Sequence, residues 1–224
     1  MSYISNQKMN ILKLLKVTTS AQHASIEARL PLLDANMSKG VYLSLLQKFF
    51  CYYTPLEAQL MQMFPDGPGN FAYATRQKAR LLALDLRALG MTAFTIAELP
   101  HCRALPEMET VAQAWGSLYV IEGATLGGQI ISSHLRENLT LDATSGAAFF
   151  TGYGSETGTH WKNFCASLMD YVARHEGSDD VISGAMQTFD TLERWLTSAA
   201  PVSTVRPSSA MLTEVEKRTR IVCS

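Results

Sequence analysis

Apolar residues recur along most of this chain at intervals of three to four positions, which is the period of an amphipathic α-helix. Strict alternation of apolar and polar residues, the pattern of a half-buried strand, is rare. We therefore predict an all-α protein. A single helical domain is expected over residues 1–200, followed by a loosely ordered C-terminal tail over 201–224.

Glycine, proline and short polar stretches separate the predicted helices. A proline inside a helix loses a hydrogen bond, so Pro55 predicts a kink in the second helix. Proline is tolerated at the first helical position, and Pro106 with two following glutamates predicts the start of the fourth. The Gly/Ser/Thr-rich stretch 140–158 predicts a long loop. The helices are expected at about 8–33, 41–64, 73–89, 106–138, 159–174 and 179–199.

Composition and charge narrow the class of protein. A hydrophobic content of 47% in 224 residues supports a large core. The net charge is −1 and no basic block occurs, which argues against a nucleic-acid surface. No apolar run reaches the ~20 residues of a membrane span, and residues 1–8 lack the features of a signal peptide. The cysteines occur in no CxxC motif and predict reduced thiols in a cytoplasmic protein: Cys51, Cys102, Cys165 and Cys223.

Three polar residues of the first predicted helix share one face: Lys16, His23 and Glu27. Steps of seven and four residues return a side chain to nearly the same side, and seven residues span ~10 Å. A neutral imidazole is a normal axial ligand of haem iron, a carboxylate can orient it, and an ammonium group can pair with a propionate. An exposed histidine with an i,i+4 carboxylate partner has the same pattern, and both interpretations stay open on this triplet alone.

Three glycines, Gly123, Gly127 and Gly128, fall inside an apolar stretch of helical period. Each costs about 1 kcal/mol relative to alanine in a helix, so the three together cost on the order of 3 kcal/mol. Gly123 and Gly127 are one turn apart and leave a strip of bare backbone. The strip predicts either a close helix crossing or, together with the histidine-bearing helix, a sandwich around a planar macrocycle.

These features resemble a known family. The stretch 116–129 reads GSLYVIEGATLGGQ and closely resembles the distal helix of haem oxygenases, best of all the bacterial branch that supplies biliverdin to phytochromes. The segment from Lys16 through Thr18 to His23 and Glu27 resembles the proximal helix. A third patch, 148–151 followed by Gly158, Trp161, Lys162 and Phe164, resembles the loop and helix that close over the haem edge. The patches are in the family's order and span about residues 12–170.

The resemblance implies an enzyme that opens the haem ring with O₂ and electrons, giving biliverdin, free iron and CO. Haem is then both substrate and cofactor. The chain carries neither a GxGxxG motif after a strand nor a P-loop, so electrons are expected from a separate donor, a ferredoxin or a flavin reductase. A phytochrome is the receiver of biliverdin that the branch suggests. No membrane or nucleic-acid partner is expected.

Carried over residue by residue, the resemblance implies that His23 is the proximal iron ligand and that Glu27 fixes this proximal side. Lys16 and Lys162 are implied as partners of the propionates. Bare backbone over the distal face leaves room for oxygen to lie across the ring edge, and backbone groups with ordered water can deliver protons. The implied distal positions are Gly123, Gly127 and Gly128.

Two departures from the family pattern affect the details. Many members place an aspartate directly after the first distal glycine, where it organises a water chain, but here that residue is Ala124. Some members place a basic residue four positions after Lys162 to steer the ring, but here it is Ala166. The water network and the cleaved meso carbon are therefore left undetermined.

Other interpretations remain at this point. A haem carrier or sensor of the same fold would bind the ring without opening it, and Ala124 is the residue that favours this alternative. An enzyme of similar helical architecture acting on thiamine fragments or quinone precursors would need a cysteine or several polar groups in its pocket. A purely structural helix bundle leaves the cost of the glycines unexplained.

Overall fold

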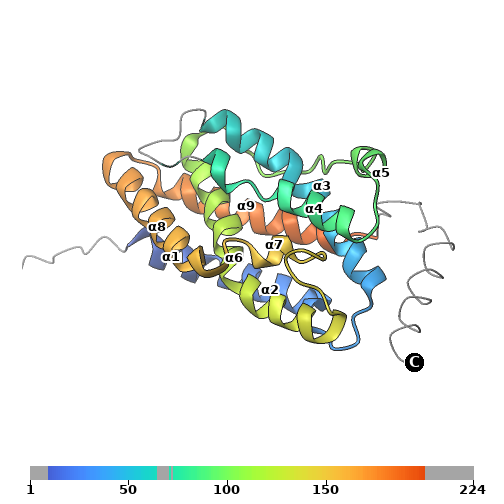
Figure 1. The fold of residues 1–224 in the computed structure, drawn as a ribbon. Helices are drawn as coiled ribbons and strands as arrows, with labels where there is room; N and C mark the ends of the chain where they lie inside the picture. The colour runs from blue at the N-terminus through green and yellow to red at the C-terminus, as the bar shows by residue number, and fades with distance from the viewer. Residues whose placement is uncertain (1–9, 65–70, 72, 200–224) are drawn as a thin grey trace, which may run out of the picture.

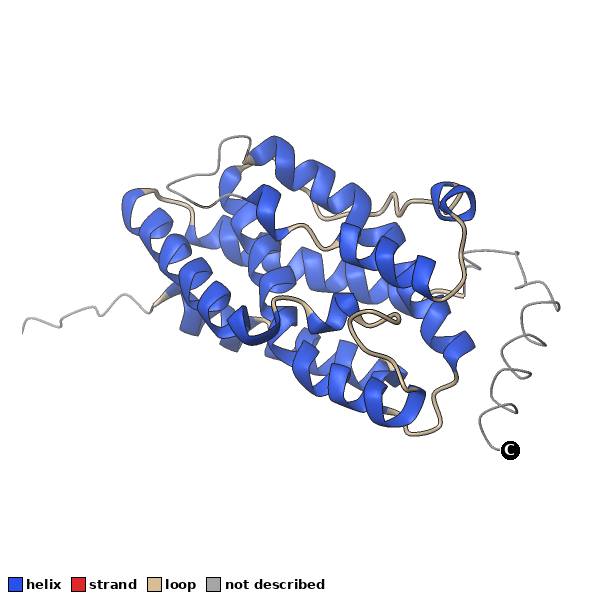
Figure 2. Cartoon of the chain, in the orientation of Figure 1, coloured by secondary structure: helices blue, strands red, loops and turns tan. Residues whose placement is uncertain are grey.

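Helices and connecting loops, with no strand, make up the part of the chain described by the computed structural model, residues 10–64, 71 and 73–199 (Figure 2). The predicted all-α fold is confirmed. Within the described residues, three short 3₁₀ turns accompany the helices: η1 Pro31–Leu33, η3 Tyr73–Arg76 and η4 Gly154–Glu156. The α-helices are α1 Ile11–Thr18, α2 Ser20–Arg29, α3 Lys39–Met63, α4 Ala79–Ala88, α5 Ala93–Ala97, α6 Val111–Leu139, α7 Ala148–Thr151, α8 Thr157–Arg174 and α9 Ser178–Thr197.

Helices α6 and α9 pack tightly through the middle of the molecule (Figure 1). Glycine on both helices makes this crossing possible, because a Cβ atom at Gly116 would lie only 2.6 Å from the backbone nitrogen of Ala185. A Cβ at Gly184 would in turn lie 2.8 Å from the carbonyl carbon of Gln113. Gly116 and Gly184 therefore allow the close crossing of α6 and α9.

Helix α3 continues through Pro55 to Met63. A proline has no backbone N–H, so the carbonyl of Cys51, four residues earlier, loses its helical partner. That carbonyl accepts a hydrogen bond from the backbone N–H of Cys102 at 2.8 Å. The segment between α5 and α6 thus replaces the bond that the proline removes.

The first predicted helix, 8–33, is wrong in its continuity. It breaks at Thr19, whose backbone (φ −96°, ψ 5°) departs from helical values and whose hydroxyl donates to the carbonyl of Leu15 at 2.8 Å. The chain resumes as α2 and ends at Arg29, because Leu30 takes the extended conformation that the following Pro31 favours. Residues 1–9 lie outside the described part.

The predicted start of the fourth helix at Pro106 is also wrong. Helix α6 begins at Val111, because Thr110 accepts a hydrogen bond from the backbone of Gln113 and the Gln113 side chain accepts one in return. This capping box fixes the start more strongly than a proline at the first position. From Val111 the helix runs without interruption to Leu139, through all three glycines of the motif.

The predicted long loop at 140–158 contains two short elements, α7 and η4. The buried carboxylate of Asp85 on α4 accepts hydrogen bonds from the backbone N–H groups of Ala148 and Phe149, at 2.7 and 2.8 Å, and so caps α7. Helix α5 was not predicted, because five residues are too few for a periodic signal. The predicted tail at 201–224 lies outside the described residues. Within the described ranges, no helix is long and apolar enough to span a membrane.

Candidate functional site

Two chain segments, 19–34 and 119–134, run side by side and carry most of the predicted site residues (Figure 1). At one end, the side chains of Tyr119 and Thr19 lie next to each other. At the other end, His134 Nε2 lies 3.1 Å from the carbonyl oxygen of Asp34. Both contacts pair residues one hundred positions apart, so the two segments run in the same direction. The fifteen residues of α6 between the contacts span about 22 Å at 1.5 Å per residue.

His23 lies one turn after the first of these contacts, and its backbone N–H bonds to the Thr19 carbonyl at 3.0 Å. Its Nδ1 atom is 3.3 Å from a carboxylate oxygen of Glu27, and its side chain is 57% exposed. The ring also meets Phe189 of α9 edge to face, with centroids 5.9 Å apart. Among the described residues Nε2 has no hydrogen-bond partner, so the nitrogen that could bind a metal is free while the other is held.

The carboxylate of Glu193 on α9, whose side chain is 15% exposed, holds helix α2 against α9. This carboxylate accepts a hydrogen bond from Ser25 Oγ at 2.8 Å and lies 3.0 Å from Arg29 Nε. The position of His23 therefore depends on contacts with α9, the helix that also supports α6.

One face of α6 is open where it faces α2. At 100° per residue, Tyr119, Gly123, Leu126, Gly127 and Ile130 project to the same side of the helix. A Cβ added at Gly127 would meet no atom within 4 Å, and one at Gly123 would meet only the Trp161 ring at 3.7 Å. Leu126 and Ile130 are 45% and 66% exposed. This set of five residues, here called the α6 platform, is thus an apolar surface with bare backbone at its centre.

Gly128 has a different environment from its two neighbours in the motif. It is buried, and a Cβ there would overlap the carbonyl oxygen of Phe150 on α7. Packing between α6 and α7 accounts for this glycine. Of the three glycines that we predicted to lie over a haem, the structure leaves Gly123 and Gly127 open and gives Gly128 a packing role.

Both predicted lysines are exposed, Lys16 on α1 and Lys162 on α8. Helices α1 and α8 are in contact, so the two ammonium groups belong to neighbouring elements. The break at Thr19 separates Lys16 from His23, which means that the seven-residue spacing does not run along one straight helix. Ala124 and Ala166 are exposed and contribute no polar group.

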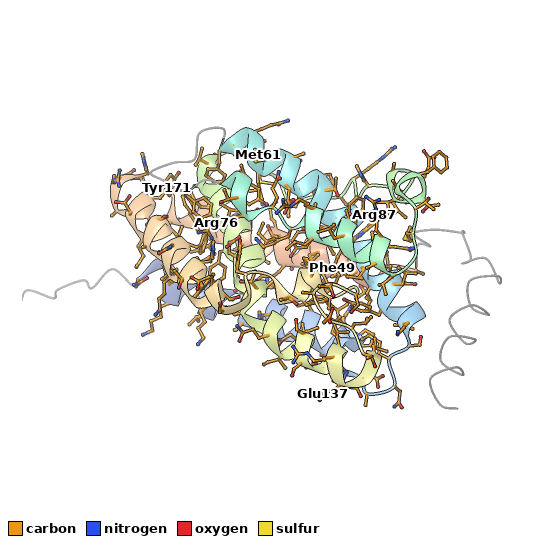
Figure 3. All side chains as sticks on the ribbon, in the orientation of Figure 1. Phe49, Met61, Arg76, Arg87, Glu137 and Tyr171 are labelled. Atoms are coloured by element: carbon orange, nitrogen blue, oxygen red, sulfur yellow. The ribbon has the colours of Figure 1, made fainter. Side chains whose placement is uncertain are left out.

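A buried ionic cluster that was not predicted from the sequence lies beside the α6 platform. Glu122 is 1% exposed, and its carboxylate lies 2.7 Å from Arg76 Nη1 and 2.5 Å from Lys78 Nζ (Arg76 is labelled in Figure 3). The hydroxyl of Tyr153 donates to the same carboxylate at 3.0 Å, and the His160 ring stacks on Tyr153 at 3.9 Å. Burial, followed by the charge of Glu122, raises the pKa of Tyr153, so this hydroxyl remains a donor. The only signal in the sequence was a glutamate inside an apolar stretch.

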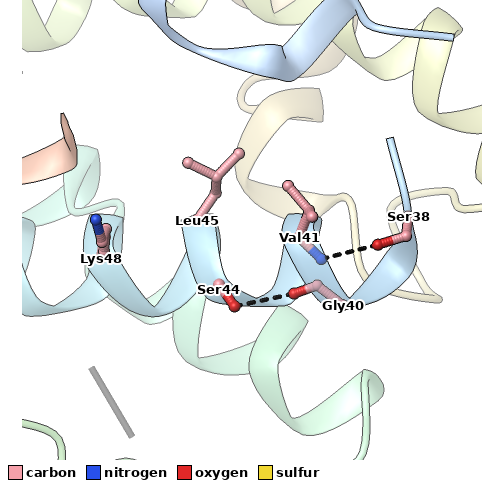
Figure 4. A pocket seen from close by; sticks show the side chains of 6 residues that line it. All are labelled: Ser38, Gly40, Val41, Ser44, Leu45 and Lys48. Carbon is pink, nitrogen blue, oxygen red and sulfur yellow. Dashed lines mark hydrogen bonds between the residues drawn. The ribbon is translucent and has the colours of Figure 1, made fainter. Parts of the chain in front are cut away.

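A shallow pocket of about 420 Å³ lies at the start of α3, where Ser38 caps the helix and Lys48 closes one end (Figure 4). None of its lining residues belongs to the predicted site. No group of three or more His, Cys, Asp or Glu side chains that could hold a metal ion occurs among the described residues.

Comparisons with known sequences agree along most of the chain. The family model of heme oxygenases matches residues 9–198. A heme oxygenase of Xanthomonas campestris pv. campestris is 28% identical over 156 residues, which make up 70% of this chain and 88% of that relative.

Solved structures share the fold. A heme oxygenase of Neisseria meningitidis, solved with NO and CO bound, superimposes with a TM-score of 0.65 at 21% identity, covering 89% of this chain and all of that one. Heme oxygenase-1 of the cyanobacterium Synechocystis, in complex with heme, gives a TM-score of 0.68 at 14% identity and covers 96% of this chain and all of that one. At these identities the likeness shows the all-α fold and its element order.

Proposed function

This chain belongs to the haem oxygenase family, and on that premise we propose that the facing sides of α2 and α6 are where it performs the family's reaction, the degradation of haem. The observation that carries the proposal is the pair of parallel segments 19–34 and 119–134. They are in contact at one end through Thr19 and Tyr119 and at the other end through Asp34 and His134. His23 and the part of the α6 platform from Gly123 to Ile130 lie between these two contacts. The family model and the relatives reported above are heme oxygenases, and none of them is a non-catalytic haem carrier.

The residues present fit a haem. The free Nε2 of His23 is the atom that can bind the iron, and Glu27 holds Nδ1, which fixes the tautomer and the ring orientation. On the opposite side, the open backbone at Gly127 admits a flat ring without a steric clash. The exposed Leu126 and Ile130 supply apolar surface of the kind that a macrocycle would cover.

When bound, haem supplies both the ring that is opened and the iron that activates oxygen. The chain's own contribution is to bind, to orient and to leave space. Gly123 and Gly127 keep side chains away from the distal side, so that a small ligand can lie along the ring. Lys16 and Lys162, exposed on the neighbouring helices α1 and α8, would pair with the two carboxylates of the ring.

The reaction consumes O₂ and electrons, and the family uses a reductase as electron donor. We propose a ferredoxin or a flavin reductase for this role, because the chain carries no nucleotide-binding motif of its own. A phytochrome is the proposed receiver of the biliverdin product. We place the reaction in the cytoplasm, where thiols such as those of Cys51 and Cys102 stay reduced.

Haem titration of the purified protein and of its His23→Ala variant tests the site. We expect one haem per chain with a histidine-ligated spectrum, and a shifted Soret band with loss of turnover in the variant. Glu27→Gln is the matched control, because it keeps the imidazole and one hydrogen-bond acceptor. An unchanged spectrum in His23→Ala would place the ligand elsewhere.

A single-turnover assay with a reductant tests the reaction itself. Catalase is included, because free peroxide can open haem without the enzyme's own chemistry. We expect biliverdin absorbance and ferrous iron in stoichiometric amounts. A haem spectrum that persists under these conditions, with neither product released, would contradict the proposal.

A further inference from the structure

The centre of the α6 platform is the part of α6 that is least able to hold a helix by itself. Two of the five residues over 123–127 are glycines. Each lowers the stability of the helix by about 1 kcal/mol relative to alanine. On the open side, this stretch makes few contacts that could compensate. The helix nevertheless continues without a break, so contacts on its flanks must hold it.

The C-terminal flank is fixed by close packing. The buried Gly128 rests on the backbone carbonyl of Phe150, which leaves no room for α6 to rotate or to move inward. The neighbouring Gln129 donates from Nε2 to the carbonyl oxygen of Gly154 at 3.3 Å. Both contacts go to one short stretch, residues 148–156, which contains α7 and η4.

The N-terminal flank is fixed by charge. Glu122 precedes the first open glycine, and its carboxylate binds both Arg76 and Lys78, which come from η3 and the start of α4. Tyr153 donates to the same carboxylate, and it lies in the 148–156 stretch that also holds the other flank. Lys78 Nζ further donates to the carbonyl of Arg76 at 2.8 Å, so the cationic side of the cluster is itself held in place.

We propose that Glu122, held by Arg76, Lys78 and Tyr153, is a positioning residue that sets the rotation and straightness of the glycine stretch. The ion pairs of Glu122 fix one end of residues 123–127, and the packing of Gly128 fixes the other end. Both sets of contacts involve the 148–156 stretch, and together they are here called the bracket. The backbone at Gly123 and Gly127 is thereby held at a fixed distance from a bound haem ring. The part of this inference that concerns haem rests on the proposed function, whereas the bracket itself does not.

A matched pair of variants separates positioning from general stability. Glu122→Gln removes the charge from α6 and leaves two buried cations facing an amide. Glu57→Gln also converts a buried carboxylate, 3% exposed, into an amide in contact with the same segment, since Glu57 accepts from the backbone N–H groups of Lys78 and Ala79. Both changes weaken the fold, but only the first touches α6.

Amide hydrogen exchange in the haem-free full chain reads the bracket directly. Exchange of residues 123–128 is compared with that of 184–188 in α9, which reports on opening of the core. In Glu122→Gln we expect the exchange rate of residues 123–128 to rise about tenfold or more, relative to the rate of residues 184–188. In Glu57→Gln we expect the exchange rates of both segments to rise by the same factor. If Glu122→Gln does not fold, Tyr153→Phe keeps every charge and is expected to show a selective acceleration of several-fold.

A spectroscopic reading connects the bracket to the site. With haem and carbon monoxide bound, the C–O stretching frequency reports on the groups that face the ligand. We expect it to shift in Glu122→Gln and to stay at the parent value in Glu57→Gln. Equal acceleration of both segments, or an unshifted frequency, overturns the inference. A parent protein that binds no haem refutes the proposed function instead, and the exchange experiment still decides whether the bracket exists.

Discussion

Gly127→Ala is expected to stabilise the haem-free protein and to impair its reaction. The added methyl group meets no atom within 4 Å, so it creates no clash in the folded chain. Alanine is favoured over glycine inside a helix by about 1 kcal/mol, and α6 is helical on both sides of this position. Natural proteins are rarely at their stability optimum, so the activity of the variant has to decide whether this glycine is kept for function.

Gly128→Ala is the matched control for this prediction. It gains the same helix propensity, but its methyl group would overlap the Phe150 carbonyl oxygen, and overpacking of this kind costs about 1–3 kcal/mol. Urea denaturation of the haem-free variants measures both effects. We expect the unfolding free energy to rise by about 1 kcal/mol for Gly127→Ala, which is roughly 2–4 °C in Tm for a chain of this size, and to fall for Gly128→Ala.

The functional half of the prediction uses the same two proteins. Gly127→Ala should retain haem binding and lose biliverdin formation in proportion to the space that the methyl group occupies, and Gly127→Leu should lose it completely. A Gly127→Ala protein that is less stable than the parent would contradict the open backbone described above. One that is more stable and forms biliverdin at the parent rate would refute the role of Gly127 in the site.

The remaining predictions concern the core and the exposed lysines. Burial raises the pKa of Asp85 to about 6, so the folded state binds a proton more tightly than the unfolded state. The free energy of unfolding should therefore fall by up to about 3 kcal/mol as pH rises from about 4 to 6, and it should stay level above pH 6. Asp85→Asn should remove this slope from urea unfolding curves taken at pH 4 and pH 7; equal slopes in both proteins would mean that Asp85 titrates normally. Gly116→Ala should lower the unfolding free energy by about 1–3 kcal/mol, because α6 and α9 must separate, whereas Gly158→Ala, with no atom within 4 Å, should leave the helix crossing intact. Lys162→Ala should weaken haem binding up to about fivefold in a titration, as expected for an exposed charge pair worth at most about 1 kcal/mol, without changing Tm; an unchanged Kd would remove Lys162 from the site.

Much of the fold could be predicted, because long helices impose a 3.6-residue period that is visible in the sequence. The errors occur where a single local interaction overrides that period. Thr19 departs from helical backbone values and so ends α1, and the hydrogen bonds of the capping box at Thr110 start α6 five residues after the proline that appeared to start it. Threonines of this kind look alike in a sequence, and only the folded chain shows which of them make such bonds.

The candidate site was predictable in part. The i,i+4 spacing of His23 and Glu27 predicts their contact, because helix geometry alone brings the two side chains together. The cluster around Glu122 could not be predicted, since its partners are more than thirty residues away and meet only in the folded chain. The three glycines of the motif also look equivalent in the sequence, although a Cβ atom at Gly128 would overlap α7 and one at Gly127 would meet no atom within 4 Å.

The hydrogen bond from Cys102 to the Cys51 carbonyl has a consequence for how the molecule opens. It joins the middle of α3 to an irregular segment that has no helical hydrogen bonds of its own, so the two are expected to unfold as one cooperative unit. Replacing Pro55 by alanine would supply an N–H from within the helix that competes with Cys102 for the Cys51 carbonyl. A residue that weakens one helix when considered alone therefore couples the unfolding of two parts of the chain fifty residues apart.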